Sequence, residues 1–322
     1  MKIEYSPNDY TPVEEGLCFG FSTESEEPTD VEVEVVNADT EEVVAVKLLR
    51  QVVSGEVNIA PYVERFSERA PQQVGEGGSA LSQLESVRYK IRIGEVESES
   101  VAVSPIRCGF SAPALLTTMP LRRKIFCDGC DELLFAVQDN TDVEVIITPN
   151  IGAVKSLTYK AASGVMRLLL TPSEFGQDAK RIYVQIKLNA QELCCVEYEV
   201  LQRRGRSLCV AWESECGSVE RYIFPMTYAL RNEVTKQRVG DGNNLNAVAI
   251  TRSKIVRAMS NSEPRNVVAA LSEIIASPKV WFEYDVRWHK VDVVTSEECY
   301  NLFGEPDFVE LDLRVESRRV VL

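Results

Sequence analysis

The amino-acid sequence predicts a mainly β protein, built from antiparallel, β-sandwich-like domains with one α+β domain at the C-terminal end. The first observation is an alternation of apolar and polar residues, as in 31–35, 87–93, 182–188, 196–200 and 309–316. Successive side chains of a strand point to opposite faces, so this alternation is typical of half-buried antiparallel strands. The second observation is that a single long segment, Ser262 to Ala276, has helical periodicity instead.

The chain of 322 residues is long enough for about two or three domains. We place boundaries near Pro105 and near the basic run Arg203 to Arg206, which we interpret as a solvated turn between domains. This division predicts an N-terminal β-sandwich-like domain (1–105) and a second β domain (106–204). A C-terminal α+β domain with a hairpin and one amphipathic helix (205–322) completes the chain.

Two segments of the first domain depart from the strand pattern. The segment Ile59 to Glu68 predicts one or two helical turns, because Pro61 suits a first turn and Tyr62, Val63 and Phe66 fall on one side. The segment Ala70 to Gln83 is polar, rich in glycine and without periodicity, so we expect a mobile loop inside the first domain.

The second domain contains the sharpest metal or redox pattern, Cys127-Asp128-Gly129-Cys130. Asp-Gly is a favoured two-residue hairpin loop; in such a hairpin the two cysteines would face each other, and a disulfide could form under oxidation. A zinc site needs four ligands, and a redox pair favours a helix after the motif. The residues that follow, Asp131 to Val137, read as a strand instead, so we expect neither a bound metal nor a structural disulfide.

A hairpin opens the third domain. Alternation leads into Trp212 and continues through Tyr222 and Phe224, and the connection Glu213 to Glu220 contains Gly217, which suits a positive φ. The cysteine-flanked, acidic loop of this hairpin could be taken for a catalytic or metal site, but we interpret its aromatic residues as structural.

The helix of the third domain has clear end signals. Ser262 is the expected N-cap, Pro264 lies in the first turn, and Pro278 follows the end. Its apolar stripe predicts packing on a sheet, and we expect a C-terminal core formed by Leu271, Ile274, Ile275 and Trp288.

Composition excludes several function classes. The formal net charge of −14 argues against nucleic acid and anionic membrane as partners. The first residues have no apolar secretory segment, no apolar run approaches a membrane span, and nine unevenly spaced cysteines fit reduced thiols. His289 is the single histidine, and the sequence has no nucleophile elbow and no phosphate-binding loop. We therefore expect no catalytic residues and no cofactor.

The spacing Trp-x-x-x-x-Gly-x-x-Glu-x-Tyr-x-Phe, Trp212 to Phe224, resembles a hairpin of uncharacterised tail-structure proteins from phages and prophage-like elements of Bacteroides-type bacteria. Those proteins usually have Asn two residues after the Trp and a Gly-Gly pair, whereas this chain has Ser214 and Gly217-Ser218. The stretches "GEVNIAPYVERF", "LSEIIASPKVW" and "KVDVV" are similar to segments that the family has in the same order.

The resemblance implies a virion structural protein of the tail tip, baseplate or an adaptor, without an active site. It would bind itself, in a ring or head to tail, and other tail proteins. It would reside in the host cytoplasm during assembly and then in the virion tail. A β-sandwich adhesin or carbohydrate-binding module is the alternative, and glycan is expected as a partner only in that case. An enzyme is the least favoured class.

Overall fold

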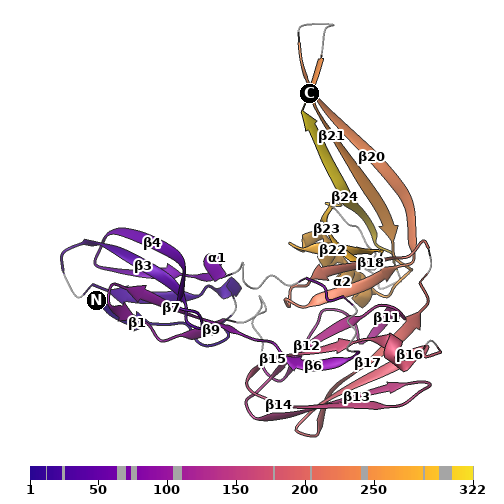
Figure 1. The fold of residues 1–322 in the computed structure, drawn as a ribbon, viewed down its shortest axis with the longest axis horizontal. Helices are drawn as coiled ribbons and strands as arrows, with labels where there is room; N and C mark the ends of the chain where they lie inside the picture. The colour runs from indigo at the N-terminus through magenta and orange to yellow at the C-terminus, as the bar shows by residue number, and fades with distance from the viewer. Residues whose placement is uncertain are drawn as a thin grey trace.

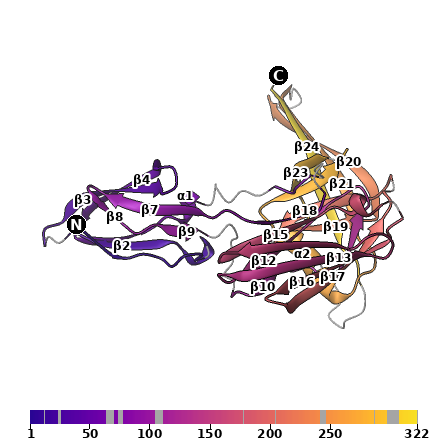
Figure 2. The ribbon, with the colours of Figure 1, turned by 60° about the horizontal axis from the view of Figure 1, so that its bottom comes forward.

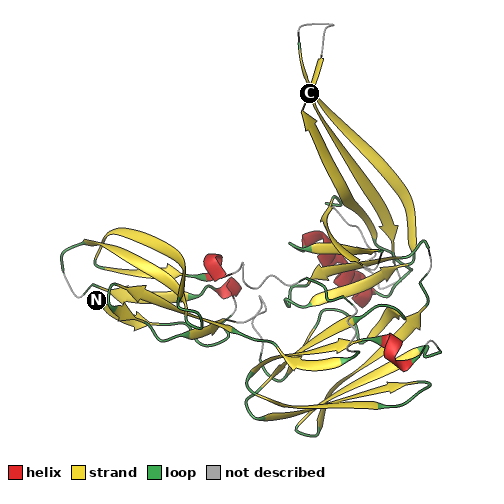
Figure 3. Ribbon diagram, viewed as in Figure 1, coloured by secondary structure: helices red, strands yellow, loops and turns green. Residues whose placement is uncertain are grey.

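The computed structural model describes residues 1–322 except 12, 24–25, 64–69, 74–77, 104–110, 177, 204, 241–245, 286, 297–306 and 322. Strands dominate the described residues, and the one long helix lies in the C-terminal third, which confirms the predicted mainly β class (Figure 3). Figure 1 places the N-terminal domain at one end, the second and third domains together at the other, and a long β arm that projects from the third.

The N-terminal domain is a sandwich of two sheets. One has the strand order β1 (Lys2–Tyr5), β2 (Cys18–Ser22), β5 (Ser54–Asn58); the other has the order β4 (Glu42–Val52), β3 (Thr29–Asn37), β7 (Val87–Ile93), β8 (Val96–Glu97), with β9 (Val101–Val103) also on β7. The predicted alternation holds, since Val31, Val33 and Val35 are all buried in the core between the sheets. A short 3-10 turn, η1 (Val13–Glu15), precedes β2.

The predicted helical turn of this domain is α1 (Ala60–Val63). Asn58 precedes it, and its Oδ1 accepts hydrogen bonds from the backbone N–H groups of Ala60, the first helical residue, at 2.9 Å and of Leu17 at 3.0 Å. Residues 64–68 of the predicted segment, Phe66 among them, lie outside the described residues.

The second domain is also a sandwich (Figure 2). One sheet has the order β10 (Ala114–Leu116), β12 (Asp131–Val137), β15 (Gly164–Leu170), β6 (Ala80–Gln83). The other has the order β11 (Arg122–Phe126), β17 (Gln191–Leu201), β16 (Arg181–Leu188), β13 (Thr141–Pro149), β14 (Lys155–Ala161). Pairing is antiparallel except between β11 and β17, which are parallel. A 3-10 turn, η3 (Pro172–Phe175), follows β15.

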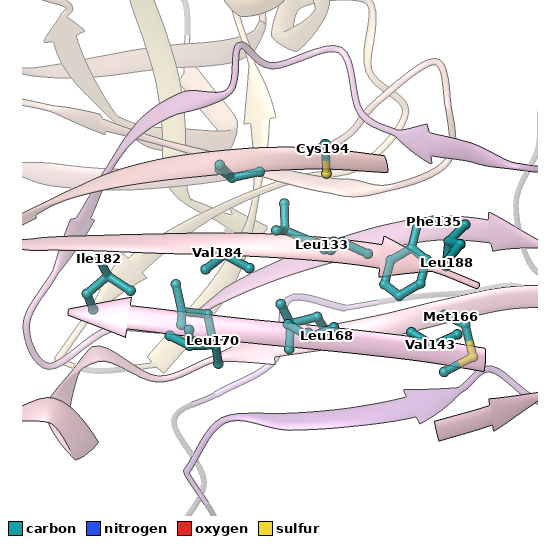
Figure 4. Packing of buried hydrophobic residues seen from close by; sticks show 14 of the residues in the cluster. Leu133, Phe135, Val143, Met166, Leu168, Leu170, Ile182, Val184, Leu188 and Cys194 are labelled. Atoms are coloured by element: carbon teal, nitrogen blue, oxygen red, sulfur yellow. The ribbon is translucent and has the colours of Figure 1, made fainter. Parts of the chain in front are cut away.

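Alternating residues of both sheets fill the core of the second domain. Figure 4 shows Phe135 of β12, Leu168 of β15 and Val184 of β16 pointing into the space between the sheets, where each is fully buried. The alternation of 182–188 therefore arises because one face of β16 is in this core and the other faces out.

The prediction of a loop inside the first domain at Ala70 to Gln83 was wrong for its last four residues. Residues 80–83 form β6, which belongs to the second domain and pairs with β15, with Leu81 opposite Leu168. The structure also holds this segment by side chains, since Glu174 Oε2 accepts from Ser79 N at 3.0 Å and from Lys155 Nζ at 2.8 Å. The chain thus leaves the first domain after α1, adds a strand to the second domain, and returns as β7.

The third domain is one seven-stranded sheet with a helix packed against it. The strand order is β19 (Val219–Phe224), β18 (Leu208–Glu213), β22 (Val280–Tyr284), β23 (Arg287–Val293), β24 (Glu310–Val321), β21 (Asn246–Met259), β20 (Met226–Val239). The helix is α2 (Arg265–Ala276), and the buried side of α2 includes Val267, Leu271 and Ile274.

The predicted helix is confirmed, but its N-cap is Pro264 rather than Ser262. The preceding residue pairs as an isolated β-bridge, because Glu263 and Asp307 exchange backbone hydrogen bonds of 2.7 and 3.0 Å. This bridge holds the chain extended up to Pro264, so the helix begins two residues later than a serine cap would allow.

The strands β20, β21 and β24 continue well beyond the core and form the arm of Figure 1. β20 and β21 have 14 residues each, and β20 is the edge strand. From residue 229 onward nearly every side chain of β20 is exposed.

Candidate functional site: the joint between the second and third domains

The hairpin predicted at Trp212 to Phe224 is present as β18 and β19, with Trp212 opposite Glu220. The unpaired connection is shorter than expected, Ser214 to Ser218, because Glu213 still pairs with Val219. Gly217 has the predicted positive φ of 72°, and the hydroxyls of Ser214 and Ser218 are 2.8 Å apart across the turn. These short-range bonds make the connection a closed turn.

One face of the hairpin packs on the core of its own domain. Trp212 and Phe224 are 0% exposed and lie in one cluster with Leu271 and Ile274 of α2, while Ile275 is partly buried against the same cluster. The Tyr222 and Phe224 rings meet edge to face at 4.9 Å. These aromatic residues and the buried side of α2 therefore form one hydrophobic core.

The other face of the hairpin packs on the second domain, and both of its strands are buried along their whole length. Cys209 and Ile223 contact Phe126 at the end of β11, and Trp288 lies partly buried beside them. β19 is the edge strand of its sheet, so the second domain covers an edge that would otherwise be open.

Trp288 is therefore not part of the C-terminal core as predicted. Val291 of the same strand, β23, points into that core, and Trp288 points away from it on the other face of the strand. The Trp288 Nε1 donates a hydrogen bond to the carbonyl of Gln72 at 3.1 Å. The sequence contained the signal: an odd separation from Val291 places Trp288 on the opposite side of a strand.

Four buried charged side chains tie the two domains together. Arg123 Nη1 of β11 lies 3.3 Å from Asp131 Oδ2 and 3.1 Å from Glu220 Oε2 of the hairpin. Arg221 Nη1 lies 3.4 Å from Asp131 Oδ1 and donates to the Cys130 carbonyl at 2.7 Å. Two cations and two anions make this cluster neutral, which is the condition for burying charge at tolerable cost.

Neutral groups add hydrogen bonds to the cluster. Tyr198 OH donates to Asp131 Oδ2 at 2.8 Å, and Ser218 Oγ donates to Glu220 Oε1 at 2.8 Å. Burial by itself would lower the pKa of Arg123, but the charges of Glu220 and Asp131 outweigh it and raise that pKa. Burial, and then the charge of Asp131, raise the pKa of Tyr198. Arg123 therefore stays charged and Tyr198 stays protonated.

The basic run was predicted to be a solvated turn, and for Arg203 this is wrong. Its guanidinium pairs with Asp128 and Glu283, each at 3.0 Å, and lies 4.3 Å from the centre of the Phe126 ring. Arg203 thus bridges the second and third domains. Arg204 lies outside the described residues.

The cavity at this joint has a volume of about 20 Å³. Gln72, Phe126, Cys130, Arg221 and Trp288 are among its lining residues. Such a volume accommodates about one water molecule.

The turn of Cys127 to Cys130 is not a hairpin. β11 and β12 on either side of it belong to different sheets, so the turn carries the chain from one layer of the sandwich to the other. Cys127 Sγ donates to Gln202 Oε1 at 3.2 Å and Cys130 Sγ to the Gln72 carbonyl at 3.1 Å. Each thiol thus has its own hydrogen-bond acceptor, and neither takes part in a disulfide.

The last candidate residue is the single histidine of the sequence. His289 is an exposed residue of β23, with its ring 5.5 Å from that of Phe282. Within the described ranges, no group of three or more His, Cys, Asp and Glu residues is placed to hold a metal ion. No helix in the described part of the chain is long and apolar enough to cross a membrane.

Glu273 of α2 gives the third domain a predictable pH response. Burial raises the pKa of its carboxyl, although a 2.9 Å hydrogen bond from Thr118 Oγ1 opposes the shift. Because its pKa is higher in the folded state than in the unfolded state, the protonated carboxyl stabilises the fold at acid pH. This contribution to the free energy of unfolding is lost as the pH rises through the folded-state pKa. The stability of Glu273→Gln relative to wild type should therefore increase from acid to neutral pH in urea unfolding. Glu310→Gln, at an exposed position, is the control, and equal slopes for the two variants would contradict the argument.

A scan against protein-family models and a search of curated proteins found no match to this chain. The site is therefore characterised by its own geometry: a hairpin buried on both faces, a neutral cluster of buried charges that joins two domains, and an arm outside any core.

Proposed function

We propose that this protein is a structural subunit of a phage or prophage-like tail, in the tail tip, baseplate or an adaptor, and that it acts through protein–protein contacts. The observation that carries the proposal is the arm. An exposed 14-residue edge strand is a ready template for association, and a protein that functions alone normally shortens or covers such an edge.

The joint supports the same proposal. A subunit that transmits contacts from one neighbour to the next needs domains held in a fixed relation, and the buried charges of Arg123, Asp131, Glu220 and Arg221 fix the second domain on the third. The contact surfaces that we propose are the edge strands.

Light scattering of the purified protein, alone and with the products of neighbouring genes, tests the proposal. We expect a mass of two or more copies, or a complex with a tail protein, that grows with protein concentration. A strict monomer under both conditions that binds a glycan array would instead favour the adhesin or carbohydrate-binding alternative.

A further inference from the structure

The charge of the chain is distributed very unevenly between its ends. Residues 1–103 contain 21 Asp and Glu against 8 Lys and Arg, a formal net charge of −13. Residues 104–322 contain 28 against 27, a net charge of −1. Within that part, residues 229–257, which form most of β20 and β21, contain 6 basic and 2 acidic residues. An acidic N-terminal domain and a basic arm therefore lie on the same molecule.

The arm presents an apolar and basic face. Leu230, Val234 and Lys236 of β20 share one side by alternation, and Leu230 and Val234 are 62% and 48% exposed. Across the ladder, Arg252 of β21 is opposite Val234 and Ile250 is opposite Lys236. Among the described residues, neither Lys236 nor Arg252 forms an ion pair. The face thus offers large exposed aliphatic side chains next to cations that lack an anion.

The N-terminal domain presents an apolar and acidic face. On the edge strand β4, Val46 and Leu48 are 54% and 52% exposed, which is unusual for neighbouring aliphatic residues on one side of a strand. Glu34 and Glu32 of β3 lie directly opposite them, on the outer side of the sheet. Glu34 pairs with Arg92 at 3.2 Å, whereas Glu32 forms no ion pair among the described residues, so Glu32 is the unpaired acidic charge of this face.

We propose that the arm face of one copy (Leu230, Val234, Lys236, Arg252) packs on the β3–β4 face of the next copy (Glu32, Glu34, Val46, Leu48). The inference rests on the proposed function and names its surfaces. Each face places exposed aliphatic residues beside charge that has no ion-pair partner among the described residues, Lys236 and Arg252 on the arm and Glu32 on the receiving face. These unpaired charges are opposite in sign, which favours this partner over a copy in any like-to-like arrangement. Two sheet faces of this kind pack about 10 Å apart.

The two faces are far apart on one chain, as both views of the ribbon show (Figures 1 and 2). The contact therefore joins separate copies, and because it uses two different surfaces it is heterologous. Such a contact closes into a ring when the rotation between copies allows, and otherwise continues as a filament.

A charge swap tests the proposal by sedimentation velocity at low and high salt. The arm variant is K236E/R252E and the receiving variant is E32K/E34K. Each alone places like charges in contact, so each should weaken association at least about tenfold. In an equimolar mixture every arm meets an oppositely charged face, so association should return. K160E/K180E, at exposed positions of the second domain, makes the same charge change as the arm variant and should associate like wild type.

Circular dichroism establishes that each variant is folded before it is compared. If E34K disturbs the first domain by removing the ion pair with Arg92, the single pair E32K and R252E repeats the swap. If wild type associates and both charge-reversal variants associate equally well, the proposed contact surfaces are wrong, while the proposed function is unaffected. Variants that dissociate without rescue on mixing would also overturn the pairing. Wild type that stays monomeric at all salt and protein concentrations would overturn the proposed self-association as well.

Discussion

Replacing Trp212 with alanine should lower the free energy of unfolding by about 3–5 kcal/mol. Trp212 is 0% exposed and fills the space between the hairpin and α2, where Leu271 and Ile274 are also fully buried. Truncation leaves a cavity that neighbouring strands cannot close, because β18 is held on one side by β19 and on the other by β22.

Urea unfolding monitored by tryptophan fluorescence is the measurement. The three tryptophans of the chain all lie in the third domain, at 212, 281 and 288, so two reporters remain in the variant. Tyr284→Ala is the matched control, because this aromatic residue of the same domain is 68% exposed and its loss should cost less than about 0.5 kcal/mol. A Trp212→Ala variant as stable as this control would show that the hairpin does not depend on its tryptophan.

Replacing Arg123 with methionine should destabilise the protein by about 3–5 kcal/mol, since it leaves Glu220 buried without its cation. The side chains of Arg123 and Glu220 are 3% and 1% exposed, and water cannot replace the lost partner. Because this pair spans two domains, the variant should also loosen the second domain from the third. Unfolding followed by circular dichroism and by fluorescence should then give two separate transitions where wild type gives one.

The adjacent residue supplies the control for this experiment. Arg122 is on the same strand, but its side chain is 88% exposed and pairs with Glu197 on the surface, so Arg122→Met should cost about 0–1 kcal/mol. The double variant Arg123→Met with Glu220→Gln should cost less than the sum of the single changes, because it removes both charges. Equal effects of Arg122→Met and Arg123→Met would exclude a role for the buried pair.

Strands and the helix could be predicted because their causes are local. Alternation in 87–93 and 182–188 reflects one buried face, and the stripe that contains Leu271 and Ile274 reflects one buried side of α2. The aromatic hairpin was predictable for the same reason, since its register follows from a short connection.

Several departures from prediction come from contacts between segments distant in the chain. β6 has only one large apolar residue, Leu81, and becomes a strand because β15 offers it an open edge. The Cys127 to Cys130 turn has the local chemistry of a hairpin, yet its two strands find better partners in different sheets. The cluster of Arg123 and Glu220 could not be predicted either, since residues of two domains form it.

The excursion of β6 into the second domain has a mechanical consequence. The chain passes between the first and second domains three times, after α1, between β6 and β7, and between β9 and β10. A force that pulls the first domain away must therefore shear β6 from β15 as well as straighten a linker. A proteolytic cut in any one of the three passages would leave the two fragments bound to each other. In an assembly that bears load, this connection would resist separation of the two domains, whereas a single linker would only limit how far apart they move.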